Sequence, residues 1–505
     1  MKKRNDSLQV KCIYKNMTNK QQNIVEYIFI FVIVLITFIL CRSLGIKNDE
    51  LKTQTLMIAA LAGTSGYALY LSAGNRLTAE KIMQCVIIGG IIMRVGYMIY
   101  THMFIRGNDL GEFSSKIYEN GTGHLGYIYY IAENGKLPDS NLYQLYHPPL
   151  YHILSAITVR IAGIFLKPGD MQGAFEFVQI INCTVACIML PILRDFFNEI
   201  EIDKKYAPWA MAIVAFLPCF YQMGGRLNND MLVVFFMLLC IIYTYRWYKK
   251  RNMKTIVCLA LCFGFGMMSK ISCGTMAFFT GLVMLYVLYK DFRAKAAGQT
   301  VRQLIVFAAI CVPLALWYPI RNYIMFKQPL NYVLELGTNS FVYRGNIPWY
   351  QRMFEFSLSE MISHPFADAA HDNSVLMYAL RTAMFGEAEF IDRQFAASIL
   401  NVINFMLVVA SFVSMIYVMI KNKTINLKYK YGLALVWTIM FGAFIQFNFA
   451  FPYICTANFR YMPLTTVIGA VYIIYAMQTT ERKYISAAVK ILIFSWCVFG
   501  SIVYI

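Results

Sequence analysis

Long apolar segments alternate with short polar segments along almost the entire chain. A helix of about 20 apolar residues is long enough to cross the hydrocarbon core of a membrane. The pattern therefore predicts an all-α polytopic membrane protein with about 13 transmembrane helices. The predicted spans are residues 24–41, 54–73, 82–104, 176–193, 207–223, 229–247, 254–268, 272–289, 302–320, 397–420, 430–450, 460–477 and 485–504.

Two further apolar segments, 148–166 and 375–386, are ambiguous. If 148–166 crossed the membrane, the basic loops at 246–254 and 290–302 would face outward. Lys and Arg are enriched in loops on the inner side of a membrane. We therefore expect 148–166 to lie on the outer face or to dip into it.

This topology divides the chain into two parts. Residues 1–23 form a basic cytoplasmic N-terminus, and residues 24–505 form a single polytopic membrane domain whose first span stays in the mature protein. The domain has two long outer segments, 105–175 and 321–396. We expect the first of them to be a catalytic outer loop with interfacial helices.

The composition agrees with this class, and the positions of the basic residues explain the net charge. Hydrophobic residues make up 59% of the chain and charged residues 14%, which excludes an ordinary soluble protein. The net charge is +18, but the basic residues are concentrated in the loops predicted to lie inside. They therefore set orientation, and nucleic-acid binding is left without support. The positive-inside pattern favours a multi-pass protein of a bacterial cytoplasmic membrane, with its active site on the outer face.

Cysteine usage adds no chemistry. Most of the 13 Cys lie inside apolar runs, and no CxxC motif is present. We interpret them as small apolar filler rather than as disulfides or a metal site.

Acidic and histidine side chains gather in the first outer segment. Asp109 and Glu112 closely follow a span, and the spacing of HLGYIYYI predicts a short amphipathic helix that begins near His124 and stops at a glycine. The YHPPLYH motif presents His147 before a helix and His152 one turn inside it. The helix could be only an interfacial anchor and the turn only a rigid cap. Alternatively, the histidines could bind a metal, a phosphate or an acceptor.

Single basic residues stand beside apolar spans at four later outer boundaries, namely Arg226, Lys270, Arg321 and Arg460. Each alone could be a snorkelling anchor at a helix end. Four at one face favour a cationic ring that binds phosphate. Asp230 could cap the following span or line the same site, and Glu387 in the second outer segment is a further candidate.

A basic ring at membrane depth with carboxylates above it suggests a lipid-linked phosphate ligand. The phosphate would lie at headgroup level, and its lipid tail would lie between helices. A carboxylate of the first outer segment could then deprotonate an acceptor hydroxyl or hold a divalent cation against the phosphate. This arrangement suits group transfer from a lipid phosphate, and a divalent cation is the candidate cofactor.

The order of these motifs resembles the GT-C superfamily of membrane glycosyltransferases. Within it, the chain is similar to the bacterial branch related to dolichyl-phosphate-mannose protein mannosyltransferases and to lipid A aminoarabinose transferases. The residues that carry the resemblance are Asp109, GHLGYIYYI (123–131), YHPPLYH (146–152), the NND after Arg226, Ser-Lys (269–270), PIRN (319–322), FGE (385–387) and CTANFRY (455–461).

The resemblance implies transfer of a sugar from a polyprenyl-phosphate-linked donor to a glycan, lipid or protein acceptor. It implies an acidic catalyst in the first outer loop, which we assign to Asp109 because this residue lies closest to the end of its span. Glu112 is the second candidate. Lys270 and Arg460 are the implied partners of the donor phosphate. HPPL is followed here by Tyr-His, where the O-mannosyltransferases have Gly-Lys, which leaves the sugar and the acceptor open.

Two other functions are compatible with the same pattern. A transporter or flippase of lipid-linked sugars would share the basic ring, but it should need polar residues in mid-span. Here Arg94 is the main one. A non-catalytic membrane scaffold would tolerate the loss of the outer acids.

Overall fold

The computed structural model describes residues 19–103, 122–141, 144–422, 424–480 and 482–505. Within these ranges the fold is helical, apart from an isolated antiparallel bridge between Tyr343 and Tyr453. The predicted spans lie in α2 (Asn19–Ser43), α3 (Glu50–Ala73), α4 (Ala79–Tyr100), α8 (Gln179–Glu199), α9 (Ala207–Ala215), α10 (Pro218–Gly225), α11 (Asp230–Lys250), α12 (Met253–Ser269), α13 (Met276–Arg293), α14 (Ala297–Phe326), α18 (Gln394–Lys421), α19 (Leu427–Ala450), α20 (Leu464–Thr479) and α21 (Lys483–Tyr504).

Shorter helices lie between these elements. They are α5 (Gly123–Asn134), α6 (Leu150–Phe165), α7 (Met171–Glu176), α15 (Trp349–Phe354), α16 (Leu358–Ser363), α17 (Val375–Phe385) and the 3₁₀ helices η2 (Ile271–Thr275), η3 (Ile391–Arg393), η4 (Ile454–Ala457) and η5 (Phe459–Tyr461).

The all-α polytopic class is confirmed. In the described part of the chain, ten helical segments are long and apolar enough to cross a membrane, or eleven when α9 and α10 count as one bent span. The other two predicted spans correspond to α12 and α20, which are shorter apolar helices. The second ambiguous segment forms α17, whose 11 residues fall short of the roughly 17 that a span needs.

The predicted span 207–223 is broken in its middle. The axes of α9 and α10 differ by 49°, and Pro218 opens the second helix, where it can supply no backbone N–H to continue the first. The break leaves carbonyl groups at the end of α9 without the N–H partner four residues later that a continuous helix would supply. Arg94, which is 1% exposed, donates to them from Nη1 to the oxygen of Ala215 (2.6 Å) and from Nη2 to that of Val214 (3.2 Å). The charged side chain of Arg94 in mid-span therefore satisfies the hydrogen-bonding groups at the break between the two helices.

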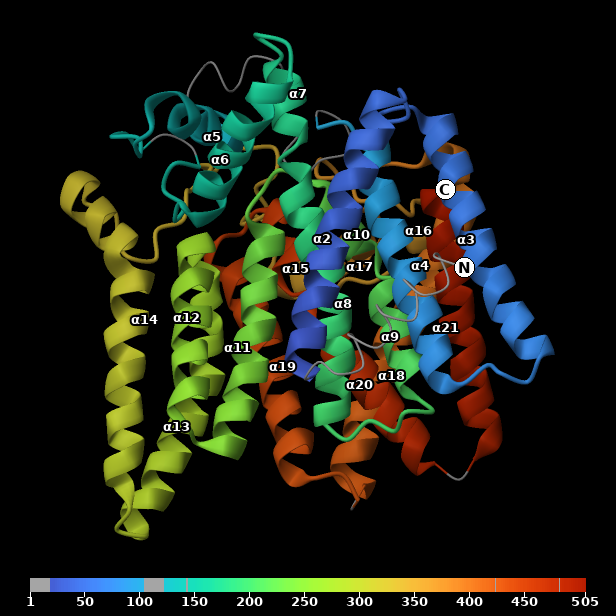
Figure 1. Cartoon of the computed structure of the whole chain (residues 1–505). Coiled ribbons are helices and arrows are strands. Elements are labelled where there is room, and N and C mark those ends of the chain that lie inside the picture. Colours follow the sequence, from blue (N-terminus) through green and yellow to red (C-terminus); the bar gives the residue numbers. More distant parts are fainter. Residues whose placement is uncertain (1–18, 104–121, 142–143, 423, 481) are drawn as a thin grey trace, which may run out of the picture.

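The helices sort the connecting segments to two ends of the bundle (Figure 1). The figure shows α5, α6 and α7 gathered at one end, with the basic connections after α11 and α13 at the opposite end. The 16-residue α6 packs against α5 and α7 at its end of the bundle. This placement suits a segment that does not cross the membrane. Cysteine labelling can test on which side of the membrane the following connections lie.

We expect the connection after α11 to face the cytoplasm, because a non-crossing α6 leaves it on the same side as the N-terminus. A Lys250→Cys variant should resist a membrane-impermeant maleimide on intact cells and react after permeabilisation. Lys136→Cys, exposed beyond α5 at the other end, should react on intact cells. The described native cysteines are buried or partly buried, so they should contribute little background. Labelling of residue 250 from outside would mean that 148–166 spans the membrane.

Candidate functional site

A cavity of about 450 Å³ lies at the α5–α6 end of the bundle. The start of α11, the junction of α12 with η2, the end of α14 and its following loop, the end of α19 and η4–η5 form its walls, and residues 144–148 complete them. Polar groups surround one end, whereas Val233, Met237, Met440 and Phe444 line an apolar part. The step from Asp230 to Met237 along α11 corresponds to about 10 Å. The cavity therefore joins a polar end to an apolar groove between helices.

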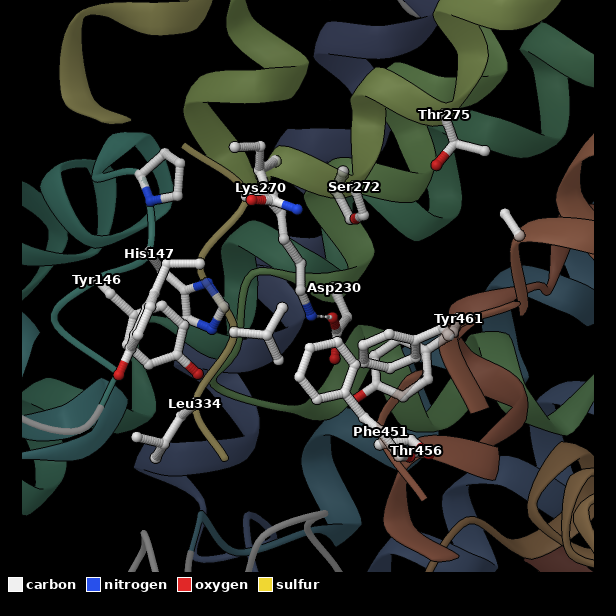
Figure 2. A pocket seen from close by; sticks show the side chains of 18 of the residues that line it. Tyr146, His147, Asp230, Lys270, Ser272, Thr275, Leu334, Phe451, Thr456 and Tyr461 are labelled. Atoms are coloured by element: carbon white, nitrogen blue, oxygen red, sulfur yellow. Dashed lines mark hydrogen bonds and ion pairs between the residues drawn. The ribbon is translucent and has the colours of Figure 1, made fainter. Parts of the chain in front are cut away.

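Three charged side chains form the centre of the polar end. The Lys270 ammonium lies 2.5 Å from Oδ1 of Asp230, and the Arg460 Nε lies 3.5 Å from Oδ2. Figure 2 shows this pair of Lys270 and Asp230 between His147 on one side and Tyr461 on the other. Both cations also lie about 5.1 Å from the centre of the Tyr461 ring, within reach of a cation–π interaction. We call Asp230, Lys270 and Arg460 the ion triad.

The NND motif joins the beginning of α11 to the end of α12. Asn228 Oδ1 accepts a hydrogen bond from the Asp230 N–H (3.2 Å), and Asn229 Nδ2 donates to the carbonyl of Ser269 (2.9 Å). Lys270 follows Ser269 directly and has an extended backbone, which ends α12 and turns the side chain toward Asp230. The neighbouring motifs therefore position the first two members of the triad.

The NFRY segment positions the third member. Asn458 Oδ1 accepts from the Arg460 N–H (3.1 Å), and Asn458 Nδ2 donates to Oε1 of Glu387 (3.2 Å). The Phe459 N–H donates to the Thr382 hydroxyl (3.0 Å), which fastens η5 to α17. Glu387 thus acts as a support for the loop that carries Arg460.

A glycine permits the close packing beside Glu387. Gly386 has a φ of +60°, and a Cβ there would lie 2.4 Å from Oε1 of Gln222 and 2.6 Å from Nη2 of Arg226. Only glycine accommodates both the backbone and the contact without strain. Arg226 itself is buried and donates to Gln222 Oε1 (3.3 Å), so it lies next to the FGE turn.

Three histidines meet beside the triad, as the clustering of outer histidines suggested. Nδ1 of His124 lies 3.0 Å from Nε2 of His152, and the rings of His124 and His147 are stacked 5.9 Å apart. Tyr127 stacks on His152 at 4.1 Å. Burial lowers the pKa of His147 well below its usual range, and the nearby Lys270 charge lowers it further. Burial and His124 likewise lower the pKa of His152. Both rings are therefore neutral near pH 7.

The end of α14 holds the HPPL turn in place. The Tyr318 hydroxyl donates to the carbonyl of Leu145 (2.6 Å) and accepts from the Tyr127 hydroxyl (2.7 Å). Arg321 donates to the carbonyl of Pro138 (2.7 Å) and lies 3.3 Å from Asp139. The PIRN motif thus fastens α14 to the loop after α5.

The structure brings together only part of the predicted site. The predicted candidates that line the cavity are His124, His147, Asp230, Lys270 and Arg460. His152, Arg226 and Glu387 adjoin this group without being among its lining residues, and Arg321 faces the α5 loop. The predicted ring of four cations is therefore two cations with a carboxylate between them. Asp109 and Glu112 lie outside the described residues.

Sequence reasoning missed the tyrosines. Tyr146 and Tyr461 line the cavity, and Tyr127 and Tyr318 hold its turn. The chain has 35 Tyr, so residue type alone does not distinguish the tyrosines at the cavity from the others. Their position next to the HPPL and NFRY motifs was the available signal. Among the described residues, no group of three or more His, Cys, Asp or Glu is placed to hold a metal ion. A divalent cation remains a prediction that involves Asp109 or Glu112.

The fold and cavity are those of a polytopic membrane protein with a charged site above an apolar groove. Residues 146–317 match the family described as dolichyl-phosphate-mannose-protein mannosyltransferase. The match runs from the HPPL turn to the end region of α14 and includes the NND and Ser-Lys motifs. It confirms the resemblance over this range and supports a membrane glycosyltransferase of the GT-C type. No curated protein matches the chain.

Because His152 is buried as the neutral imidazole, the free energy of unfolding should depend on pH. The unfolded imidazole has a pKa of about 6.5, above that of the folded state, so the unfolded chain binds more protons as the pH falls below 6.5. The free energy of unfolding should then drop by up to about 1.4 kcal/mol per pH unit until the folded pKa is reached. His152→Gln should flatten the dependence of Tm on pH between 6.5 and 5 in detergent. The exposed His371→Gln is the control, and an unchanged slope in the His152 variant would contradict this assignment.

Proposed function

We propose that this protein transfers a sugar from a polyprenyl-phosphate-linked donor to an acceptor at the outer face of a bacterial cytoplasmic membrane. The observation that carries the proposal is that one and the same cavity is lined by Lys270 and Arg460 and by the apolar side chains of the groove. A ligand that fills both parts needs an anionic head and a hydrocarbon tail. The family match over 146–317 makes glycosyl transfer the chemistry that fits such a ligand.

The donor would enter with its phosphate toward the ion triad. Lys and Arg offer charge-assisted hydrogen bonds to phosphate oxygens, and the side chain of Lys270 is partly accessible from the cavity. The first isoprene units would lie against Val233, Met237 and Phe444. In this orientation the anomeric carbon would lie on the side of the phosphate that faces away from the lipid tail, where an acceptor can approach.

Asp109 is our proposed general base. It would take the proton of the acceptor hydroxyl as that oxygen attacks the anomeric carbon, with Glu112 as the second candidate. Eight residues before Asp109 in the chain, the Thr101 carbonyl at the end of α4 accepts hydrogen bonds from Lys47 Nζ (2.9 Å) and Gln179 Nε2 (3.1 Å). His124, His147 and His152 would shape the acceptor side. The acceptor itself would be a glycan, a lipid or a protein.

The flippase alternative has less support. It would need a polar path through the bundle, yet the guanidinium of Arg94 donates to backbone carbonyls at the α9 break. Its hydrogen bonds are therefore used to close the helix. A reconstituted assay separates the alternatives: sugar on an acceptor indicates a transferase, donor movement alone a flippase, and neither result a scaffold.

Removal of one cation should weaken donor use. In Lys270→Gln, the loss of a charge-assisted hydrogen bond worth about 1.5–3 kcal/mol should reduce kcat/KM by about tenfold to a hundredfold. Most of this change should be a higher KM for the donor. Lys136→Gln, an exposed residue at the same end, should transfer sugar normally. A Lys270 variant with wild-type kcat/KM would exclude this residue from donor binding.

Loss of the base should abolish turnover without unfolding the protein. Asp109→Asn should be as abundant and as monodisperse as wild type but should show no sugar transfer, whereas Glu112→Gln should retain activity. Glycan mass spectrometry of a complemented deletion strain measures transfer. If the first variant transfers normally and the second does not, the catalytic role belongs to Glu112.

A further inference from the structure

A carboxylate in the middle of a phosphate site needs an explanation, because it competes with the ligand for the same cations. Asp230 is 4% exposed and contacts Lys270 at 2.5 Å and Arg460 at 3.5 Å. These three are the charged side chains among the described residues that line the cavity. Their sum is a single positive charge. Without Asp230, the same site would carry two.

Asp230 cannot easily leave this position. It is the first residue of α11, where the positive end of the helix dipole favours a carboxylate. Its N–H is bonded to Asn228, and its neighbour Asn229 is bonded to the end of α12. The negative charge is therefore a fixed part of the phosphate site.

The transfer reaction changes the charge of the phosphate at this place. The donor is a phosphodiester with one negative charge. In transfer, the bond between the anomeric carbon and the phosphate oxygen breaks, and a bond from that carbon to the acceptor oxygen forms. The acceptor proton passes to the general base, and the leaving group is a polyprenyl phosphate monoester with a charge near −2. The ligand therefore gains negative charge as the reaction proceeds.

We propose that Asp230 matches the charge of the site to the singly charged donor and so favours release of the doubly charged product. This inference rests on the proposed function. With Asp230 in place, the site and the donor phosphate neutralise each other, whereas the product leaves an excess negative charge. A buried charge that is left uncompensated is costly because little water solvates it, so the pairing that leaves no excess charge is favoured. Asp230 is thus a specificity-determining residue, and its second effect is to hold Lys270 and Arg460 in position.

Binding measurements on the full-length protein in nanodiscs can test this role. The probes are a polyprenyl monophosphate and the methyl phosphodiester of the same lipid, which differ in charge. Wild type should bind the diester more tightly. Asp230→Asn should reverse the order and bind the monophosphate at least about tenfold more tightly than wild type, a change of about 1.4 kcal/mol. Asp230→Glu should keep the wild-type preference.

Turnover provides the second readout. Asp230→Asn should have a lower KM for donor, a lower kcat and stronger inhibition by polyprenyl phosphate, whereas a purely structural role would raise KM. Asp291→Asn is the matched control, because Asp291 pairs with Arg251 (2.6 Å) at the opposite end of the bundle. Its order of preference should be that of wild type.

Two results would overturn the inference. One is that the wild-type protein binds the monophosphate more tightly than the diester. This result does not depend on whether any variant folds. The other is an Asp230→Asn variant that elutes as wild type in size-exclusion chromatography yet loses affinity for both lipids. Failure of wild type to bind either lipid would instead refute the proposed function itself.

Discussion

The need to pair charges where water is scarce organises this end of the molecule. An unpaired buried ion costs several kcal/mol, so Asp230, Lys270 and Arg460 must meet if any one of them is buried. They come from the start of α11, the end of α12 and η5, which are remote from one another in sequence. The contacts of Asp230 with the two cations join the start of α11, the end of α12 and η5 at one point, and these residues line the cavity. This arrangement is the basis of our proposal that the two cations bind an anionic ligand.

Backbone N–H and C=O groups outside regular helices also need partners within the protein near a membrane, because lipid offers no hydrogen-bond partner. The break between α9 and α10 is closed by Arg94. In the second large segment, the guanidinium of Arg344 donates to five backbone carbonyls. Asn448 and Thr456 bond to each other where α19 gives way to η4. Buried polar side chains here therefore support non-helical backbone, and the site is built from the segments they hold.

Sequence reasoning was strongest where one physical term dominates. Apolar length alone determines which segments can form membrane spans, so the predicted spans coincide with helices, and Gly135 ends α5 in the left-handed conformation that glycine favours. It was weaker where a residue has several possible partners. Arg321 and Lys270 occupy similar positions at the ends of spans, yet the first bonds to Pro138 and the second to Asp230. Nothing local distinguishes the two, because the choice depends on which loop packs above each helix.

The sequence by itself determined the membrane class, the helical segments and the motifs that could carry chemistry, since hydrophobic length and residue type are properties of the chain alone. Only the tertiary structure decided which of those motifs share a cavity. It selected Lys270 and Arg460 from the basic residues, assigned Arg94 to backbone closure and placed Asp230 between two cations. The physical reason is that burial and the distance between charges, which determine whether a charged group binds a ligand or supports the fold, arise only when separate helices pack together.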